Sequence, residues 1–285
     1  MKKVLIISNP LAGKGKPIKA LSKVTQILQN SDFSIVKYFT ISKSDYSGII
    51  NAINTNSDID LLIVSGGDGT LNDVVNSIPE EFKIPIIVLP CGSGNDFATY
   101  LYGNKTIDEI LRNLQAPKTT NINIGICNGK KFINGLGIGF DGWVAKKAAE
   151  GVKYIPPSLK YYTAILRGIF TFRSFNTNLG KALIIAVANG PTYGGGFRIA
   201  PEANPTDGFF DLWHIKPIKV LKRALYLDII KKGKHKNDGI TFDFKLLKEI
   251  KITCERTVPA HLDGEYLESD IFEVKISPVD LVFVV

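Results

Sequence analysis

The chain has 285 residues, of which 35 are Lys or Arg and 27 are Asp or Glu, and its formal net charge is +8. A chain of this length exceeds the usual size of a single hydrophobic core, so we expect two domains. The sequence has no long apolar run, no signal-like start, no Cys-x-x-Cys pair and no histidines at metal-ligand spacing. These absences argue against a membrane-spanning helix, export, a disulfide scaffold and a zinc site.

The first half of the chain alternates apolar runs with helix-like stretches. We expect strands at residues 4–8, 35–39, 61–65 and 84–89. We expect helices at residues 17–29, 45–54, 70–78 and 106–114. This alternation predicts a parallel sheet with covering helices, and therefore an α/β domain over residues 1–125.

Two of these strands run directly into glycine-rich turns. The apolar run 60–64 continues into residues 65–72, Ser-Gly-Gly-Asp-Gly-Thr-Leu-Asn, and the strand at 84–89 continues into a second turn at 90–98. The two turns can face one cleft, because the carboxyl ends of parallel strands share an edge. Glycines let backbone N–H groups approach a phosphate closely, and Asp68 among such phosphates favours a nucleotide and metal site. A plain strand-to-helix turn remains the alternative.

A third turn, at residues 9–16, follows the first strand. It looks like a phosphate-binding loop but lacks the spacing Gly-x-x-x-x-Gly-Lys-[Ser/Thr]. The sequence therefore does not predict a Walker-type P-loop.

From about residue 126 the pattern changes to short strands separated by Gly, Asn and Pro. We expect strands at residues 131–134, 182–188, 208–215, 242–244, 249–254, 271–276 and 281–285, and helices at 142–151, 158–174 and 217–232. This spacing predicts an antiparallel sandwich or barrel, and therefore an all-β domain over residues 126–285. The glycine run at 135–142 mimics a dinucleotide fingerprint but lacks the opening βαβ position that such a site requires.

Most of the net positive charge lies in residues 126–285, which contain 23 basic and 16 acidic residues. Residues 1–125 contain 12 basic and 11 acidic residues. Eight of the basic residues crowd one window: Lys216, Lys219, Lys222, Arg223, Lys231, Lys232, Lys234 and Lys236. This cluster is consistent with an anionic membrane surface or with a solvated helix face. No nucleic-acid-binding motif accompanies it, so we expect no nucleic-acid partner. The aromatic and aliphatic stretch at 154–170 is consistent with the lining of an acyl-chain entrance, with a helix on a membrane surface, or with a helix that packs on the sheet by one apolar stripe.

Four motifs in order carry a family resemblance: Asn9-Pro10-x-Ala12-Gly13, Gly66-Gly67-Asp68-Gly69-Thr70, Leu89-Pro90-x-Gly92-Ser93-Gly94-Asn95-Asp96-Phe97-Ala98 and Leu262-Asp263-Gly264-Glu265. Together they resemble the bacterial diacylglycerol kinase family of soluble lipid kinases, which is related to sphingosine kinases. Ser93 stands where the family more often has Thr, and it keeps the hydroxyl. The resemblance implies a Rossmann-like nucleotide domain, of the kind shared with NAD kinases, followed by an antiparallel β-sandwich.

The resemblance also implies ATP and Mg²⁺ as cofactors and a role for individual residues. ATP contacts are implied for Asn9, Pro10, Leu11, Ala12, Gly13, Thr40, Gly66, Gly67, Asp68, Gly69, Thr70, Leu71, Asn72 and Ser93. Glu265 is implied as the catalytic base with Asp263 assisting, and Asp68 and Asp96 as the organisers of the catalytic Mg²⁺. A structural Mg²⁺ is implied at the Asp207 side chain and the carbonyls of Asn204 and Phe209, where a bare Asp-Gly turn is the alternative.

These observations predict an ATP-dependent lipid kinase that acts in a cleft between its two domains, with diacylglycerol as the leading acceptor and phosphatidic acid as the product. Another lipid alcohol, such as phosphatidylglycerol or a sphingoid base, remains an alternative acceptor. NAD kinase activity and a non-catalytic sensing role also remain open. We expect a cytoplasmic protein that associates with the inner face of the membrane, and exposed strand edges would allow a homodimer.

Overall fold

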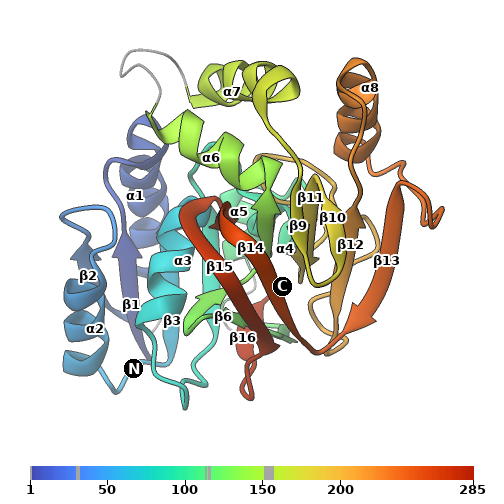
Figure 1. The fold of residues 1–285 in the computed structure, drawn as a ribbon. Coiled ribbons are helices and arrows are strands. Elements are labelled where there is room, and N and C mark those ends of the chain that lie inside the picture. Colours follow the sequence, from blue (N-terminus) through green and yellow to red (C-terminus); the bar gives the residue numbers. More distant parts are fainter. Residues whose placement is uncertain (1, 30–32, 113, 115–116, 151–156) are drawn as a thin grey trace. The chain divides into compact units, whose positions relative to one another are not determined.

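The computed structural model describes residues 2–29, 33–112, 114, 117–150 and 157–285. It separates into two compact units, one formed by Met1–Ile124 together with Ser277–Val285 and the other by Gly125–Ile276 (Figure 1). Each unit has its own sheet and its own buried core.

The first unit is built on a six-stranded sheet in the order β2-β1-β3-β4-β16-β5. Its strands are β1 (Lys2–Ser8), β2 (Phe33–Phe39), β3 (Leu61–Gly66), β4 (Ile86–Pro90), β5 (Thr119–Ile122) and β16 (Leu281–Val284). Neighbouring strands are parallel except for β5, which runs antiparallel to β16. All six residues of β3 are buried, as expected for a central parallel strand whose two faces are both covered.

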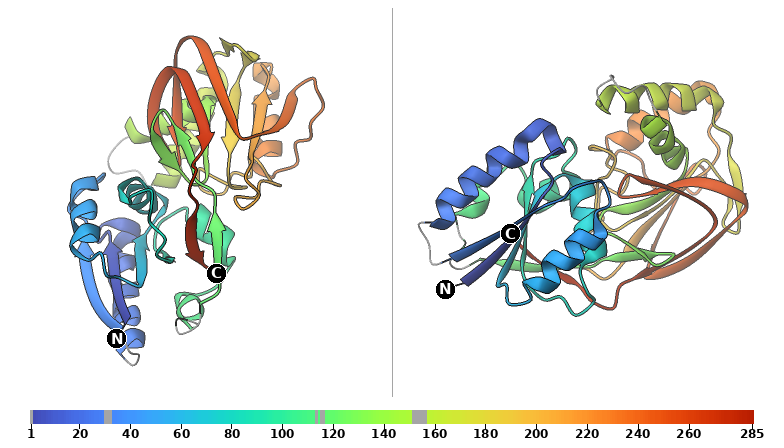
Figure 2. Two further views of the ribbon diagram at one scale, coloured as in Figure 1. Left: turned by 90° about the horizontal axis from the view of Figure 1, so that it is seen from below. Right: turned by 90° about the vertical axis from the view of Figure 1, so that its left-hand side faces the viewer.

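Helices cover this sheet on both faces. They are α1 (Lys16–Gln29), α2 (Tyr46–Thr55), α3 (Asp68–Ser77), α4 (Asp96–Tyr102) and α5 (Ile107–Leu111). Figure 2 shows α1 and α2 on opposite sides of the strands, because right-handed connections place helices on opposite faces when the chain reverses its direction across the sheet. That reversal lies between β1 and β3, the position at which open α/β sheets bind ligands. The strands and helices expected in this half are confirmed, although α5 is shorter than the expected 106–114 and residue 113 lies outside the described residues.

The last strand corrects our assignment of residues 281–285 to the β-rich domain. It is β16, which lies in the sheet of the first unit between β4 and β5. Phe283 pairs with Ile86, is fully buried and packs edge-on against Phe97 with ring centroids 4.9 Å apart. The apolar pattern of this segment specifies a strand but not the sheet that it joins. Residues 277–285 therefore belong to the first unit.

The second unit is built on a ten-stranded antiparallel sheet. Eight strands follow the order β13-β12-β11-β8-β14-β15-β6-β7, and β9 pairs with both β14 and β10. The strands are β6 (Gly125–Cys127), β7 (Lys130–Phe132), β8 (Gly135–Gly139), β9 (Phe175–Thr177), β10 (Gly180–Ala182), β11 (Ile184–Ala188), β12 (Phe210–Ile215), β13 (Phe242–Leu247), β14 (Glu249–Leu262) and β15 (Glu265–Ile276). The antiparallel strands expected from residue 126 onward are thus confirmed as far as β15.

The glycine run at 135–142 forms strand β8 and the start of a helix rather than a dinucleotide turn. We did not predict β8, because glycine is depleted in strands. The strand is fully buried between β11 and β14. At Gly137 a Cβ would lie 2.1 Å from a carboxylate oxygen of Asp141 and 2.5 Å from Nε2 of His261, so a side chain there would displace both groups.

Three helices belong to the second unit: α6 (Phe140–Glu150), α7 (Pro157–Thr171) and α8 (Val220–Lys231). Helix α6 packs on β8 and β14, and α7 packs on α6 and α8 (Figure 1). The expected helix at 142–151 and the stretch at 154–170 extend into residues 151–156, which lie outside the described residues. None of the helices in the described ranges combines the length and the apolar character needed to cross a membrane.

Arg223 is a buried residue of α8 and not part of the surface charge with which we grouped it. Its guanidinium donates hydrogen bonds to the carbonyl oxygens of Ile169, at 2.9 Å, and of Phe172, at 2.8 Å. Its Nε donates to the carbonyl of Ile218 at 3.1 Å. Arg223 therefore joins α8 to the end of α7, where the last carbonyls of a helix need donors.

Candidate active site

Three loops of the first unit meet at the carboxyl edge of β1, β3 and β4. A Cβ placed on Gly67, after β3, would lie 2.8 Å from the Cα of Gly92, after β4. A Cβ on Gly13, in the loop after β1, would lie 1.8 Å from the carbonyl oxygen of Cys91. The loops touch through their backbones, and only glycine permits that approach. The predicted convergence of the glycine turns is therefore present within this unit.

Asn9 holds the first loop to the start of α3. Its N–H donates to the carbonyl of Ser65 at 3.1 Å, its Oδ1 accepts the N–H of Leu11 at 3.0 Å, and its Nδ2 donates to Thr70 Oγ1 at 3.4 Å. Thr40, which follows β2, reaches the same edge because its N–H donates to the carbonyl of Ser8 at the end of β1, at 3.0 Å. The residues predicted to contact ATP are thus brought together at one edge of the sheet.

The remaining predicted ATP residues differ in their exposure. Leu71 and Asn72 are buried in the first turns of α3, whereas Ser93 is exposed in the turn that precedes α4. Pro10 and Ala12 follow β1, Gly66 is the last residue of β3, and Gly69 is the second residue of α3. Leu71 faces the core of the unit, so it contributes packing to this site rather than a side-chain contact.

Asp68 begins α3 and points at the first turn of α4. Its Oδ1 accepts the N–H of Phe97 at 3.3 Å, and the N–H groups of Asn95 and Asp96 also bond to this carboxylate. Burial raises the pKa of Asp68, while these backbone donors lower it in part. Asp96 is the first residue of α4 and is buried beside them. The two acids implied as organisers of the catalytic Mg²⁺ therefore lie next to each other, with Asp68 oriented by the helix start.

In the second unit, Asp263 and Gly264 form a two-residue hairpin turn between β14 and β15. Their φ angles are +49° and +86°, and the flanking Leu262 and Glu265 pair across the strands. Two successive positive φ angles favour an Asp-Gly sequence, so the motif matches the turn that carries it. Glu265 is the first residue of β15 and is half-buried.

The Asp263 carboxylate binds backbone donors. It accepts the N–H groups of Ile133 and Asn134 at 2.8 Å each and of Gly135 at 3.0 Å. These bonds attach the turn to the chain just before β8, and both carboxylate oxygens take part. The assisting catalytic role that the family resemblance implies for Asp263 stays a prediction.

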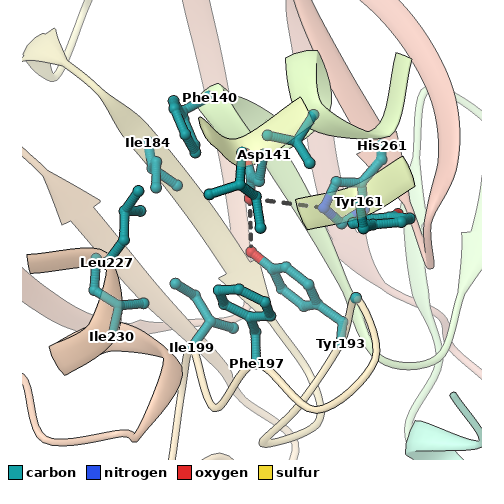
Figure 3. A pocket seen from close by; sticks show the side chains of 13 residues that line it. Phe140, Asp141, Tyr161, Ile184, Tyr193, Phe197, Ile199, Leu227, Ile230 and His261 are labelled. Atoms are coloured by element: carbon teal, nitrogen blue, oxygen red, sulfur yellow. Dashed lines mark hydrogen bonds and ion pairs between the residues drawn. The ribbon is translucent and has the colours of Figure 1, made fainter. Parts of the chain in front are cut away.

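An apolar pocket with a cavity volume of about 50 Å³ lies in the second unit (Figure 3). Its apolar walls come mainly from α6, α7, α8 and β11, through residues that include Phe140, Val144, Ile165, Ile184, Leu227 and Ile230. The pocket is therefore apolar, and its enclosed part has room for only a small portion of a lipid.

Three polar side chains meet at one end of this pocket. The Tyr193 hydroxyl donates to Asp141 Oδ2 at 2.9 Å, and His261 Nε2 lies 3.6 Å from the same oxygen (Figure 3). Burial, followed by the Asp141 carboxylate, raises the pKa of Tyr193 well above its ordinary value, so the phenol remains a donor. Sequence reasoning missed all three residues. His261 stands directly before the Leu262–Glu265 motif, and Asp141 ends the glycine run, but neither position had a motif of its own.

The turn before β12 carries the residues implied for a structural Mg²⁺. Asp207 Oδ1 accepts the N–H of Phe209 at 2.9 Å, and the Asn204 carbonyl accepts the N–H of Asp207 at 3.2 Å. Burial, together with the Asp207 and Glu202 carboxylates, raises the pKa of nearby Asp211 to about 6. An all-oxygen set of carbonyls and one carboxylate fits Mg²⁺. The described residues contain no group of three or more His, Cys, Asp or Glu able to hold a metal, so this site stays a prediction.

Comparisons with known proteins agree with this arrangement. The diacylglycerol kinase catalytic domain matches residues 3–127, and the YegS C-terminal NAD kinase beta sandwich-like domain matches residues 134–285. The Bacillus subtilis protein named Putative lipid kinase YtlR is 30% identical, over 96% of this chain and 97% of its own length. A diacylglycerol kinase of the same species is 27% identical, over 93% of this chain and 90% of its own length.

A crystal structure described as a diacylglycerol kinase from Bacillus anthracis str. Sterne has the same fold, with a TM-score of 0.74 and 23% identity over 99% of this chain and 96% of that one. The predicted fold class, an α/β domain followed by an antiparallel β-sandwich, is confirmed. The predicted enzyme class, an ATP-dependent lipid kinase, is confirmed as well. With both of its units matched and relatives aligned along nearly its whole length, the chain belongs to the diacylglycerol kinase family of lipid kinases.

Proposed function

We propose that the enzyme transfers the γ-phosphate of ATP to the hydroxyl of diacylglycerol and produces phosphatidic acid. The observation that carries this proposal is the backbone contact of the loops after β1, β3 and β4, at the switch point of a parallel sheet. Such an edge offers N–H groups and the start of α3 to the phosphates of a nucleotide. Relatives that are named diacylglycerol kinases support the choice of acceptor.

The nucleotide half of the proposal assigns ATP to the first unit. Asn9, Gly13, Gly67 and Thr70 would line the phosphates, and Thr40 and Ser93 would contribute from the same edge. Asp68 and Asp96 would hold Mg²⁺ through its waters, and Mg²⁺ when bound would neutralise charge on the transferred phosphoryl group. The bonds from the N–H groups of α4 keep the Asp68 carboxylate in one orientation before any ligand arrives.

The acceptor half assigns the lipid to the second unit. The apolar pocket under α6, α7 and α8 would hold a small portion of its hydrocarbon part. Glu265 would accept the proton of the acceptor hydroxyl. As that proton leaves, the acceptor oxygen forms a bond to the γ-phosphorus, the bond to the bridging oxygen breaks, and ADP departs. Glu265 begins a strand anchored by the Asp263 turn, which holds it in place for this step.

The proposal also includes peripheral association of a cytoplasmic enzyme with the inner face of the membrane, because its acceptor resides in a bilayer. We define the α7–α8 patch by its exposed apolar side chains, Leu159, Tyr162, Leu166, Phe170, Leu221 and Leu225. The four from α7 recur at intervals of three and four residues, so they form one outward stripe. An exposed apolar stripe of this kind is typical of a helix that lies in a membrane interface.

Basic side chains accompany the α7–α8 patch. Lys219, Lys222, Lys234 and Lys236 are exposed, whereas Lys216 pairs with Asp243 at 3.0 Å and Lys232 pairs with Asp228 at 2.6 Å. Each lysine near an anionic leaflet contributes about 1 kcal/mol. Charge and apolar exposure in and next to α8 therefore favour an anionic bilayer as the occupant of this surface.

Replacement of the proposed base tests the function. Wild-type enzyme, labelled ATP, Mg²⁺ and vesicles that contain diacylglycerol should give labelled phosphatidic acid. We expect Glu265→Gln to lower the transfer rate by at least about a hundredfold, the low end of the range for general acid–base residues, with ATP binding retained. The matched control is Glu249→Gln, which changes an exposed acid at the start of β14 and should keep full activity.

The identity of the product decides the acceptor. If a total lipid extract replaces pure diacylglycerol, a labelled phosphatidic acid supports the proposed acceptor, whereas a labelled phosphatidylglycerol or sphingoid-base product redirects it to that lipid. Full turnover by Glu265→Gln would remove Glu265 as the base.

A further inference from the structure

His261 connects the polar end of the pocket to the turn that carries Glu265. Its Nδ1 accepts the N–H of Gly264 at 3.1 Å, and its Nε2 faces Asp141 Oδ2 at 3.6 Å. In a neutral ring, the nitrogen that accepts a hydrogen bond carries no proton, so the proton sits on the other one. The bond from Gly264 therefore places the proton of His261 on Nε2, which points toward Asp141.

The surroundings keep the His261 ring in one orientation. The ring is only 3% exposed, and Tyr193 packs edge-on against it with centroids 4.8 Å apart and planes at 75°. A Cβ on Gly137 would come within 2.5 Å of Nε2, so the absence of a side chain there provides the space for the ring. A ring confined in this way transmits a displacement at one nitrogen to the other.

The Asp141 carboxylate is only partly engaged. Its Oδ1 accepts the N–H of Gly142 at 3.0 Å, and its Oδ2 accepts the hydroxyl of Tyr193 at 2.9 Å. A carboxylate has about four lone-pair positions, so a donor from a ligand can still bind. At 3.6 Å, His261 Nε2 is beyond hydrogen-bond distance from Asp141 Oδ2, and a small movement of Asp141 toward the ring would form that hydrogen bond.

The Glu265 turn is also fixed at its other end. The three hydrogen bonds of Asp263 attach it to residues 133–135, from which β8 runs directly to Asp141. The turn and the polar end of the pocket are thus linked twice, once through β8 and once through His261. Of these two links, the one through His261 contains a contact that a ligand in the pocket can change, namely the approach of His261 Nε2 to Asp141 Oδ2.

We propose that His261 is a positioning residue that couples binding of the acceptor's polar head at Asp141 to the placement of Glu265. This inference rests on the proposed function. A hydroxyl that donates to Asp141 would draw the carboxylate toward Nε2 of His261, and the ring would hold the N–H of Gly264, next to Glu265, in the reactive position. The partly buried Asp141 carboxylate favours an uncharged lipid alcohol and disfavours a head group that already carries phosphate, because like charges repel in an apolar pocket.

Two substitutions separate the two ends of the ring. In His261→Asn the side-chain oxygen lies near the former Nδ1 and keeps the bond from Gly264, but nothing reaches Asp141. In His261→Gln the amide N–H lies near the former Nε2 and keeps the contact with Asp141, but the bond from Gly264 is lost. Dioctanoylglycerol serves as the acceptor probe, with ATP and Mg²⁺ present.

We expect the two variants to differ in which kinetic constant changes. His261→Asn should raise the KM for dioctanoylglycerol by about tenfold with kcat retained, and His261→Gln should lower kcat by about tenfold with that KM retained, since a displacement of about 1 Å in a site can cost up to about a hundredfold. The KM for ATP should stay unchanged in both. The matched controls are His214→Asn and His214→Gln, which alter another buried histidine of the same unit that does not line the pocket.

A binding measurement separates failure of the inference from failure of the proposed function. Calorimetric titration of dioctanoylglycerol without ATP should show weaker binding by His261→Asn and unchanged binding by His261→Gln. If wild-type enzyme phosphorylates no lipid, the proposed function fails whatever the binding shows. If wild-type enzyme is active but both His261 variants change the same constant, or change only the melting temperature as a merely structural residue would, the inference is overturned.

Discussion

Burial controls the protonation of His235 in the second unit. The side chain is 5% exposed, its Nε2 lies 2.9 Å from the carbonyl oxygen of Ile199, and Trp213 packs edge-on against the ring. Burial lowers the pKa of His235, while the bond to Ile199 partly opposes this effect. The folded protein therefore keeps the ring neutral to a lower pH than the unfolded chain does, and the neutral ring donates its Nε2 proton to the carbonyl. In the unfolded chain it takes up a proton below about pH 6.5.

This difference predicts how stability depends on pH. Below about pH 6.5 the unfolded chain is more protonated at His235 than the folded chain is, so the free energy of unfolding falls as the pH falls. His235→Gln keeps an N–H donor for Ile199 but does not titrate. We expect the free energy of unfolding of the variant, minus that of the wild type, to increase as the pH is lowered from about 7 to about 5.

Urea unfolding of both proteins across that range provides the measurement. His214, whose pKa burial also lowers, is present in both proteins, so its contribution cancels in the difference. Parallel stability curves for the two proteins would contradict the assignment of this pH dependence to His235.

At the scale of single residues, the sequence predicted which residues meet at the carboxyl edge of β1, β3 and β4, but not which residues form the apolar pocket of the second unit. Asp68 and Gly67 stand in a contiguous motif, and one strand delivers them together. Asp141, Tyr193 and His261 come from three separate segments that meet only after the antiparallel sheet has formed. No local pattern marks such a group, because a pocket made by distant segments depends on tertiary packing.

At the scale of elements, the loops after β3 and β4 meet through their backbones. Gly67 has φ of −107° and ψ of −170°, which any residue can adopt, so glycine is needed there only for space. The nearest atom to an added Cβ is the backbone Cα of Gly92, at 2.8 Å. Backbone atoms cannot rotate away as a side chain can, so a methyl group would push the two loops apart.

Gly67→Ala should therefore weaken nucleotide binding more than it weakens the fold. We expect the KM for ATP to rise by about tenfold or more, because N–H groups that no longer converge lose part of their contact with phosphate. Gly103→Ala is the matched control. Its φ of +59° is strained for alanine, but a Cβ there meets nothing within 4 Å, so it should lower stability without changing the KM for ATP. An unchanged KM in Gly67→Ala would contradict this role of the loop contact.

The residue pattern of each element explains whether the sequence predicted it. Strands β1, β3 and β4 are short apolar runs next to helical periodicity, which identifies a parallel sheet. Strand β8 was missed because its residues, Gly-Leu-Gly-Ile-Gly, read as a loop. Its glycines instead allow neighbouring groups to pack closely against the strand. Local propensity therefore failed to predict β8, because tertiary contacts determined the residue types of this strand.

At the scale of the whole molecule, the sequence predicts the order of the elements more readily than the sheet that each strand joins. The chain leaves the first unit after residue 124 and returns to it with β16, and only strand pairing reveals that return. The α7 stretch was similarly ambiguous. One apolar stripe packing on the sheet would have explained its composition, whereas the helix has buried residues such as Ala164 and Ile169 and also the outward stripe of the α7–α8 patch.

The outward stripe leads to a prediction about membrane binding. Leu166 and Phe170 are 60% and 71% exposed, and full burial of one such side chain is worth roughly 1.5–3 kcal/mol. Leu166→Ser combined with Phe170→Ser should therefore weaken binding to vesicles of anionic phospholipid by at least about tenfold. Ile240→Ser is the matched control, because Ile240 is 79% exposed but lies outside the patch, before β13.

Co-sedimentation with the vesicles measures this effect, and turnover separates docking from catalysis. The double variant should lose activity on diacylglycerol held in vesicles but keep it on dispersed dioctanoylglycerol, because its pocket and its Glu265 turn are unchanged. Lys219→Ala combined with Lys222→Ala should weaken binding at low salt and have less effect at high salt, since screening removes the attraction of exposed charges. Equal vesicle binding by the wild type and the Leu166 and Phe170 variant would exclude the α7–α8 patch as the surface that meets the bilayer.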